Sequence, residues 1–168
     1  FSPTDVALNF SCTNTASAPS TVGLNTLLLS ASATPVPDIV ALVATPTNDG
    51  ITHLPGATGG IGSTGVFVVA SLNVGATGTI TVSADTGTVS LPVGIILCQT
   101  NTATGVCLAP PSSSVTTDIV ANTTPSFGVF VEGVGPVPFD PGVNRIFIRF
   151  KDASNVTRGS TSVAVQTP

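Results

Sequence analysis

The sequence contains no Tyr, Trp or Met and only one His, and charged residues make up 7% of its 168 positions, against roughly a quarter in ordinary globular proteins. Four basic residues leave a net charge of −4, which argues against binding to nucleic acid or to anionic membrane surfaces, because both need a basic patch. No run of about twenty apolar residues is present, so we expect no membrane span. No signal peptide is visible, so we expect a mature, processed chain.

Residue patterns for catalysis are also missing. His53 stands in "GITHLPG" without a nucleophile motif such as G-x-S-x-G, so a loop position is expected for it. The eight acidic residues are scattered singly, and the cysteine spacing fits neither a redox CxxC nor a zinc site. The glycine-rich stretch 56–65 lacks the lysine and helix of a phosphate loop, which favours a flexible hairpin loop. We therefore predict no enzyme activity, no metal site and no cofactor.

Short runs of Val, Ile, Thr and Phe fill the rest of the chain, and 17 Gly and 14 Pro interrupt them at regular intervals. Apolar residues make up 42% and the mean hydropathy is +0.53, enough for a packed core. This pattern predicts an all-β protein built as an antiparallel sandwich. The strands are expected at 25–33, 38–44, 65–73, 78–85, 88–93, 94–100, 114–121, 127–133, 144–152 and 160–167. In the run 144–152, alternation places Ile146, Ile148 and Phe150 on one face.

The two halves of the chain look like faint copies of each other. "PVPDIVALVATPTNDG" resembles "LPVGIILCQTNTATG", and each half continues with a G-x-F-x strand and a strand that ends in Asp. The pattern predicts two immunoglobulin-like sandwiches, over residues 24–92 and 93–168, although each is short for seven strands. One larger sandwich is the alternative.

The stretch "TDVALNFSC" at the start of the chain alternates as a strand with one apolar face, formed by Val6, Leu8, Phe10 and Cys12. A polar, Pro-containing linker follows it, so residues 1–23 are expected to be a detached strand and its linker. A sandwich that lacks one strand has an open edge, which this strand can fill in a neighbouring molecule by strand addition. The alternative is that residues 4–12 form the first strand of their own domain.

Cys98 and Cys107 bracket "QTNTATGV", whose centre suggests a hairpin turn. A disulfide across that hairpin is favoured and implies an oxidising compartment, and two buried thiols are the alternative. Cys12 continues the apolar face of the first strand, which is typical of a small buried hydrophobic residue. An intermolecular disulfide is the other possibility for Cys12.

The acceptor pattern N-x-[ST] for N-glycosylation occurs at Asn9, Asn122 and Asn155. Loops rich in Ser, Thr and Pro, such as "TASAPST" and "APPSSSVTT", are candidates for O-glycans as well. Covalent glycans would explain how a nearly uncharged surface stays soluble. The alternative is that these are unmodified polar loops.

Several of these stretches, from "DVALNFSC" through "GLNTLLLSASATPVPDIVALVATPTNDG" and again "LPVGIILCQTNTATGVCLAPP", "PVPFDPGVNRIFIRFKD" and "VTRGSTSVAV", cover most of the chain. They resemble secreted bacterial proteins, and in particular the immunoglobulin-like subunits of glycan-coated helical fibrils found in natural freshwater. The resemblance implies a filament of glycosylated subunits linked by donor-strand exchange. It implies that Val6, Leu8 and Phe10 are inserted into the next subunit and that the three asparagines are candidate glycan sites.

We therefore expect an extracellular or cell-surface structural protein that forms a helical homopolymer with copies of itself. Insertion of residues 4–12 into the next subunit would be the mechanism. The alternative is a secreted adhesin or a carbohydrate-binding β-sandwich module, although eight Phe are the only aromatic residues available for stacking on sugars.

Overall fold

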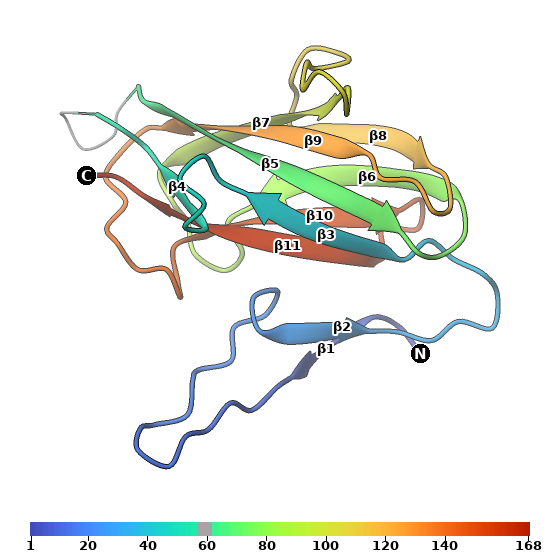
Figure 1. The fold of residues 1–168 in the computed structure, drawn as a ribbon, viewed down its shortest axis with the longest axis horizontal. Coiled ribbons are helices and arrows are strands. Elements are labelled where there is room, and N and C mark those ends of the chain that lie inside the picture. The colour runs from blue at the N-terminus through green and yellow to red at the C-terminus, as the bar shows by residue number, and fades with distance from the viewer. Residues whose placement is uncertain (57–61) are drawn as a thin grey trace.

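The computed structural model describes residues 1–56 and 62–168 of the chain (Figure 1). These residues form strands connected by turns and loops, without a helix, so the predicted all-β class is confirmed. Most of the glycine-rich stretch predicted as a hairpin loop, residues 57–61, lies outside the described residues. The strands are β1 (Thr4–Ala7), β2 (Thr26–Leu29), β3 (Ile39–Ala44), β4 (Ile51–His53), β5 (Thr64–Asn73), β6 (Gly78–Asp85), β7 (Val93–Thr100), β8 (Ser114–Ile119), β9 (Ser126–Gly133), β10 (Arg145–Asp152) and β11 (Thr157–Gln166).

Most strands of the sandwich begin and end close to the predicted positions, but one predicted strand is a turn and one short strand was missed. The predicted strand over 88–93 is a turn, in which the Thr86 hydroxyl donates a hydrogen bond to the carbonyl of Val89 at 2.6 Å. Pro92 has no N–H for a sheet ladder, and β7 begins directly after it. The three-residue strand β4 was not predicted, because a run of three residues has no detectable period.

Nine of the strands form two sheets that pack face to face. The orders are β4-β11-β10-β6-β8 in the five-stranded sheet and β3-β5-β9-β7 in the four-stranded sheet. The pairs are antiparallel except for β4, which runs parallel to β11. Both sheets contain strands from both halves of the sequence, and strands of different halves pair with each other. Phe147 of β10 lies opposite Asp85 of β6, and Phe130 of β9 lies opposite Val66 of β5.

The prediction of two sandwiches over 24–92 and 93–168 is therefore wrong, and the alternative of one larger sandwich describes the structure. A boundary at residues 92 and 93 would separate β6 from β10 and β5 from β9, although each of these pairs forms a continuous ladder. The physical reason is that strands of the two halves pair with each other in both sheets, and their inward side chains form one common core. The expectation of an open edge depended on two sandwiches that each lack a strand, so it loses its basis.

A single core lies between the two sheets. Among its largest fully buried side chains are Phe67, Phe127 and Phe150, and the rings of Phe127 and Phe150 meet edge to face at 5.7 Å. Ile146, Ile148 and Phe150 all point into this core, which confirms the predicted alternation of β10. The described core contains no residue before Ile39.

The first 34 residues, called here the arm, lie outside both sheets. In the arm, β1 pairs antiparallel with β2 in a separate two-stranded ribbon, with Val6 opposite Leu27 (Figure 1). The predicted strand over 25–33 is thus shorter and is not part of the sandwich. The predicted strand over 4–12 is also shorter, and it has a partner within its own chain.

Candidate functional site: the arm and the outer faces of the sandwich

The arm touches the sandwich through Gly23, which lies on the ring of Phe147. Gly23 has a φ of 76°, and a Cβ atom added there would lie 3.2 Å from two ring carbons of Phe147. Both the backbone conformation and the short distance favour glycine at this position. The Ser162 hydroxyl donates a hydrogen bond to the Gly23 carbonyl at 3.3 Å. Phe147 points away from the core, so the arm is anchored on the outer face of the five-stranded sheet.

The turn that carries Gly23 is held by side chains of the arm. The Thr21 N–H donates to Asn25 Oδ1 at 2.7 Å, and Asn25 Nδ2 donates to the Pro19 carbonyl at 2.9 Å. The Thr26 hydroxyl then donates to Asp5 Oδ1 at 2.7 Å and joins this turn to β1. The stretch predicted as a plain linker therefore ends in an ordered turn.

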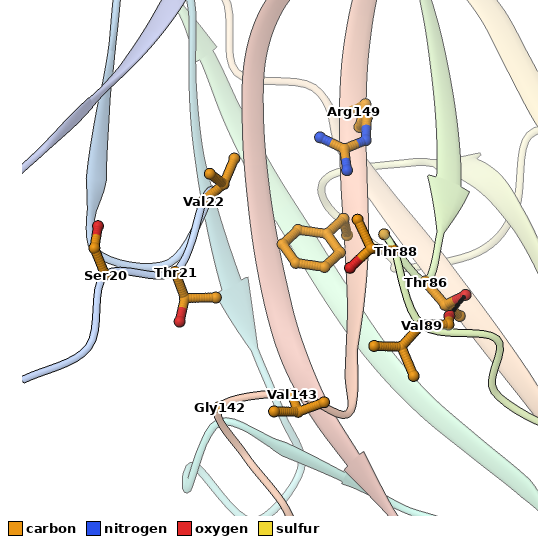
Figure 2. A pocket seen from close by; sticks show the side chains of 11 residues that line it. Ser20, Thr21, Val22, Thr86, Thr88, Val89, Gly142, Val143 and Arg149 are labelled. Carbon is orange, nitrogen blue, oxygen red and sulfur yellow. Dashed lines mark hydrogen bonds between the residues drawn. The ribbon is translucent and has the colours of Figure 1, made fainter.

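A hollow of about 340 Å³ lies between this turn and the sandwich (Figure 2). Thr21 and Val22 of the arm line one side, and Thr88 of the turn after β6 lines the other. The guanidinium of Arg149 lies 5.1 Å from the centre of the Phe147 ring. The residues that line the hollow supply hydroxyls, apolar groups and one guanidinium, so the hollow mainly marks where the arm meets the sheet.

Arg149 also forms an ion pair with Asp85, with Nε 2.5 Å from Oδ2. Burial acts to raise the pKa of Asp85, but the hydrogen bonds from Arg149 and from the Gly87 N–H outweigh it and hold this pKa below its usual value. The carboxylate is therefore ionised at neutral pH and fixes the guanidinium over the ring.

The ribbon of the arm has one face toward solvent and one that is less exposed. Val6, Leu27 and Leu29 are on the solvent face and are 39%, 51% and 45% exposed. Asp5 and Leu28 lie on the other face. The solvent face is therefore apolar, although nothing in the described residues of the chain covers it.

Of the predicted donor residues, only Val6 lies within β1. Leu8 and Phe10 follow the strand and are exposed, and the Phe10 carbonyl accepts a hydrogen bond from the Ala18 N–H at 3.0 Å. Cys12 is an exposed free cysteine. The prediction that Cys12 is a buried hydrophobic residue is therefore wrong, because the strand ends before it reaches this position.

The outer face of the five-stranded sheet is polar. Thr81 of β6 lies opposite Thr116 of β8, and their hydroxyl oxygens are 2.9 Å apart. One step along the same pair, the Thr79 hydroxyl donates to Asp118 Oδ1 at 2.6 Å. Hydroxyls and charges therefore satisfy each other in register across this face.

The outer face of the four-stranded sheet is apolar, and sequence reasoning missed it. Leu42, Val66, Val68 and Ile96 point outward and are 69%, 43%, 46% and 45% exposed. The four strands of this sheet contain one charged residue, Glu132. The signal was present in runs such as "IVALVA" and "GVFVV", which are apolar on both faces, because such runs are typical of strands covered on both sides.

The predicted disulfide between Cys98 and Cys107 is confirmed, with a Cα–Cα distance of 5.6 Å. The alternative of two buried thiols is wrong. The segment between them turns back on itself through a hydrogen bond from the Gly105 N–H to the Asn101 carbonyl at 2.8 Å. Because Cys98 is on the outer face of β7, the disulfide holds this loop at one end of the apolar face.

The three asparagines of the glycosylation patterns are all exposed. Asn9 lies on the arm, and Asn122 and Asn155 lie in turns with φ values of 60° and 62°. Asparagine adopts this left-handed conformation more readily than most residues, so the turns alone are sufficient to account for Asn122 and Asn155. Whether these positions carry glycans stays a prediction.

His53 lies in β4 and not in a loop, and its Nε2 is 2.8 Å from Asp49 Oδ2. Hydrogen bonds from His53, Thr47 and the Ile51 N–H hold the pKa of Asp49 well below its usual value. Within residues 1–56 and 62–168, no three His, Cys, Asp or Glu residues are placed to bind a metal ion together. The same ranges contain no helix long and apolar enough to cross a membrane.

A scan against protein-family models finds no match to this chain, and a sequence search of curated proteins finds no similar protein.

Proposed function

We propose that the protein is a structural subunit of an extracellular filament, in which the N-terminal arm of each subunit binds to the next subunit. The observation that carries this proposal is the arm itself. It presents an apolar solvent face, whereas the described core contains no residue before Ile39. A segment that the core does not need, and that exposes large apolar side chains, is suited to bind another molecule.

The strand order supports an immunoglobulin-like subunit. Without β4 and β8, the sandwich has seven strands in chain order. The seven strands are β3, β5, β6, β7, β9, β10 and β11. The first, second, fifth and fourth (β3-β5-β9-β7) form one sheet, and the seventh, sixth and third (β11-β10-β6) lie side by side in the other. This is the order of a constant-type immunoglobulin domain.

The chemistry of the surface supports copies of the same chain as partners. Four basic residues against eight acidic ones offer little to nucleic acid, and the exposed apolar side chains of the arm require an apolar partner surface. The disulfide between Cys98 and Cys107 is typical of secreted proteins. We expect assembly without catalysis, cofactor or metal, and with covalent glycans at some of Asn9, Asn122 and Asn155.

Electron microscopy of the full chain and of a chain that lacks residues 1–16 tests the proposal. Both chains should be secreted by a host that glycosylates proteins. We expect filaments from the full chain and folded monomers from the shortened chain, with the disulfide intact in both. A full chain that stays monomeric at high concentration would contradict the filament, and a secreted binding module would then be the better interpretation.

The glycans have a separate test in the mass of the secreted chain. Changing the third residue of a pattern, as in Thr124→Ala, removes the acceptor site and leaves Asn122 in its left-handed turn. We expect the mass to fall by one glycan in this variant. An unchanged mass would show that Asn122 is not modified.

A further inference from the structure

The apolar outer face of the four-stranded sheet has no partner within the described residues, and it is shaped for side chains. A hollow of about 430 Å³ lies around Gly128 of β9, between Val68 and the loop at 101–105. A second hollow of about 190 Å³ lies at Gly94 of β7. Phe130 lies between the two. The hollows exist where glycines leave gaps between outward-pointing side chains. The larger one, at Gly128, is the candidate for an apolar side chain, because Glu132 lines the smaller one.

The ribbon of the arm matches this face in chemistry. Its solvent face is formed by Val6, Leu27 and Leu29, and the only charged side chain of the arm, Asp5, points to the other face and is hydrogen-bonded to Thr26. An isolated two-stranded ribbon is marginally stable in water and needs a surface to pack on. A sheet face with outward apolar side chains provides such a surface, because two sheets stack about 10 Å apart.

The arm cannot cover the apolar face of its own chain while it is anchored where the structure has it. Gly23 holds it against Phe147, which is on the outer face of the opposite sheet. Figure 1 shows the ribbon below β11, outside the sandwich and away from β7 and β9. The ribbon and the apolar face therefore meet only between two molecules.

We propose that the solvent face of the arm ribbon of one copy stacks on the outer face of the four-stranded sheet of a second copy, with leucines of β2 in the hollow at Gly128. This inference rests on the proposed function and names the surface of the neighbour that the arm binds. The contact joins two different surfaces of the same chain, which lie on opposite sides of the molecule. Such a head-to-tail contact does not close on itself and extends into a filament.

Single charges on the two surfaces test the contact in the full-length secreted chain. Val66→Asp places a carboxylate on the sheet face and Leu27→Asp places one on the ribbon, and Val120→Asp at the end of β8 is the control with a similarly exposed valine. We expect both contact variants to raise the critical concentration for assembly at least about tenfold, because an unpaired carboxylate would be buried. The control should assemble like the unchanged chain.

Disulfide trapping identifies which surfaces meet. One chain carries Cys12→Ser and Leu27→Cys, the other carries Cys12→Ser and Val66→Cys, and the two are mixed and oxidised. We expect disulfides between positions 27 and 66 of different chains. Links between two copies of position 66 alone would overturn the inference in favour of a face-to-face dimer.

The remaining outcomes separate this inference from the proposed function. If removal of residues 1–16 stops assembly while Val66→Asp leaves it unchanged, the arm binds elsewhere on the neighbour and only this inference is overturned. If Val120→Asp weakens assembly as much as Val66→Asp does, the effect is one of charge in general, which also overturns it. If the unchanged chain does not assemble, both proposals are overturned.

Discussion

The two sheets of the sandwich share one core and have opposite kinds of outer face. On the five-stranded sheet, the hydroxyls of Thr81 and Thr116 meet at 2.9 Å and Arg149 pairs with Asp85. On the four-stranded sheet, Leu42 and Val66 point outward and are exposed. The inward side chains of both sheets are apolar, so the core alone does not explain the difference. One outer face therefore presents groups that bind water, and the other presents apolar side chains of the kind found at interaction sites.

The arm completes this comparison, because it is anchored on the polar face and exposes apolar side chains of its own. Gly23 of the arm lies on Phe147, one of the few apolar side chains that point outward from the five-stranded sheet. The anchored arm thus covers an apolar position on the polar face and leaves the apolar face free. The following predictions test how far the two faces and the core differ.

The largest loss of stability is expected from substitutions in β10, which has Phe150 on its inner face and Phe147 on its outer face. Phe150 is fully buried in the core, and Phe150→Ala should lower the free energy of unfolding by about 3–5 kcal/mol. Phe147 is covered mainly by the arm and a turn, and Phe147→Ala should cost less, about 1–3 kcal/mol. Urea unfolding measures both. Equal losses would show that the outer position is as much part of the core as the inner one.

The disulfide at the end of the apolar face should contribute the next largest effect. Cys98 and Cys107 are nine positions apart, and closing a loop of this length stabilises a protein by about 2–3 kcal/mol in the chain-entropy account. We expect the double variant Cys98→Ala with Cys107→Ala to unfold at correspondingly lower urea concentration. The unchanged chain under reducing conditions is the matched control. No difference between oxidised and reduced chain would contradict the prediction.

A pH dependence should distinguish the polar face. The folded-state pKa of Asp85 is lowered, so the stability from its ion pair with Arg149 is present above the unfolded pKa of about 3.9 and is lost as the pH falls below it. The variant Asp85→Asn should therefore show a shallower loss of stability between about pH 4 and pH 2. Unfolding by urea at several pH values measures this. Identical pH profiles for the two chains would argue against the role of the pair.

The smallest effect on stability is expected when a single exposed apolar residue of the apolar face is replaced by a polar one. Leu42→Thr on the apolar face should change the free energy of unfolding by less than about 0.5 kcal/mol, because Leu42 is 69% exposed. It should nevertheless reduce binding of a hydrophobic dye to the chain. A large loss of stability would mean that Leu42 is packed within its own molecule, and the comparison of the two faces would then fail at this position.

Sequence patterns were sufficient where the relevant contacts are local. The alternation in "RIFIRFK" placed Ile146, Ile148 and Phe150 inward correctly, because the side-chain period of a strand is fixed by its backbone. The disulfide was predicted correctly because Cys98 and Cys107 flank a short turn. The interruption by Gly and Pro gave the all-β class, and the alternation at Val6 gave an apolar strand at the start of the chain.

The same patterns could not predict which strands pair with each other. Period-2 alternation tells which side chains share a face, but it does not tell whether β6 pairs with a strand of its own half or with β10, 60 residues later. The faint repeat suggested that β6 pairs within its own half of the chain. In the structure it pairs with β10, because both halves contribute to one common core. Likewise, only the folded chain placed β2 in the arm with β1, because "TLLL" fits a ribbon and a sandwich equally well.

The sequence by itself therefore determined the strand class, the inward face of β10, the covalent link and the lack of charge, since these depend on neighbouring residues and on composition. The tertiary structure alone decided that two half-chains share one core, that Cys12 is exposed, and that one sheet has a second apolar face, which nothing within residues 1–56 and 62–168 covers. The physical reason is that sheet pairing and burial depend on residues far apart in the chain, which meet only when both sheets close over the same core.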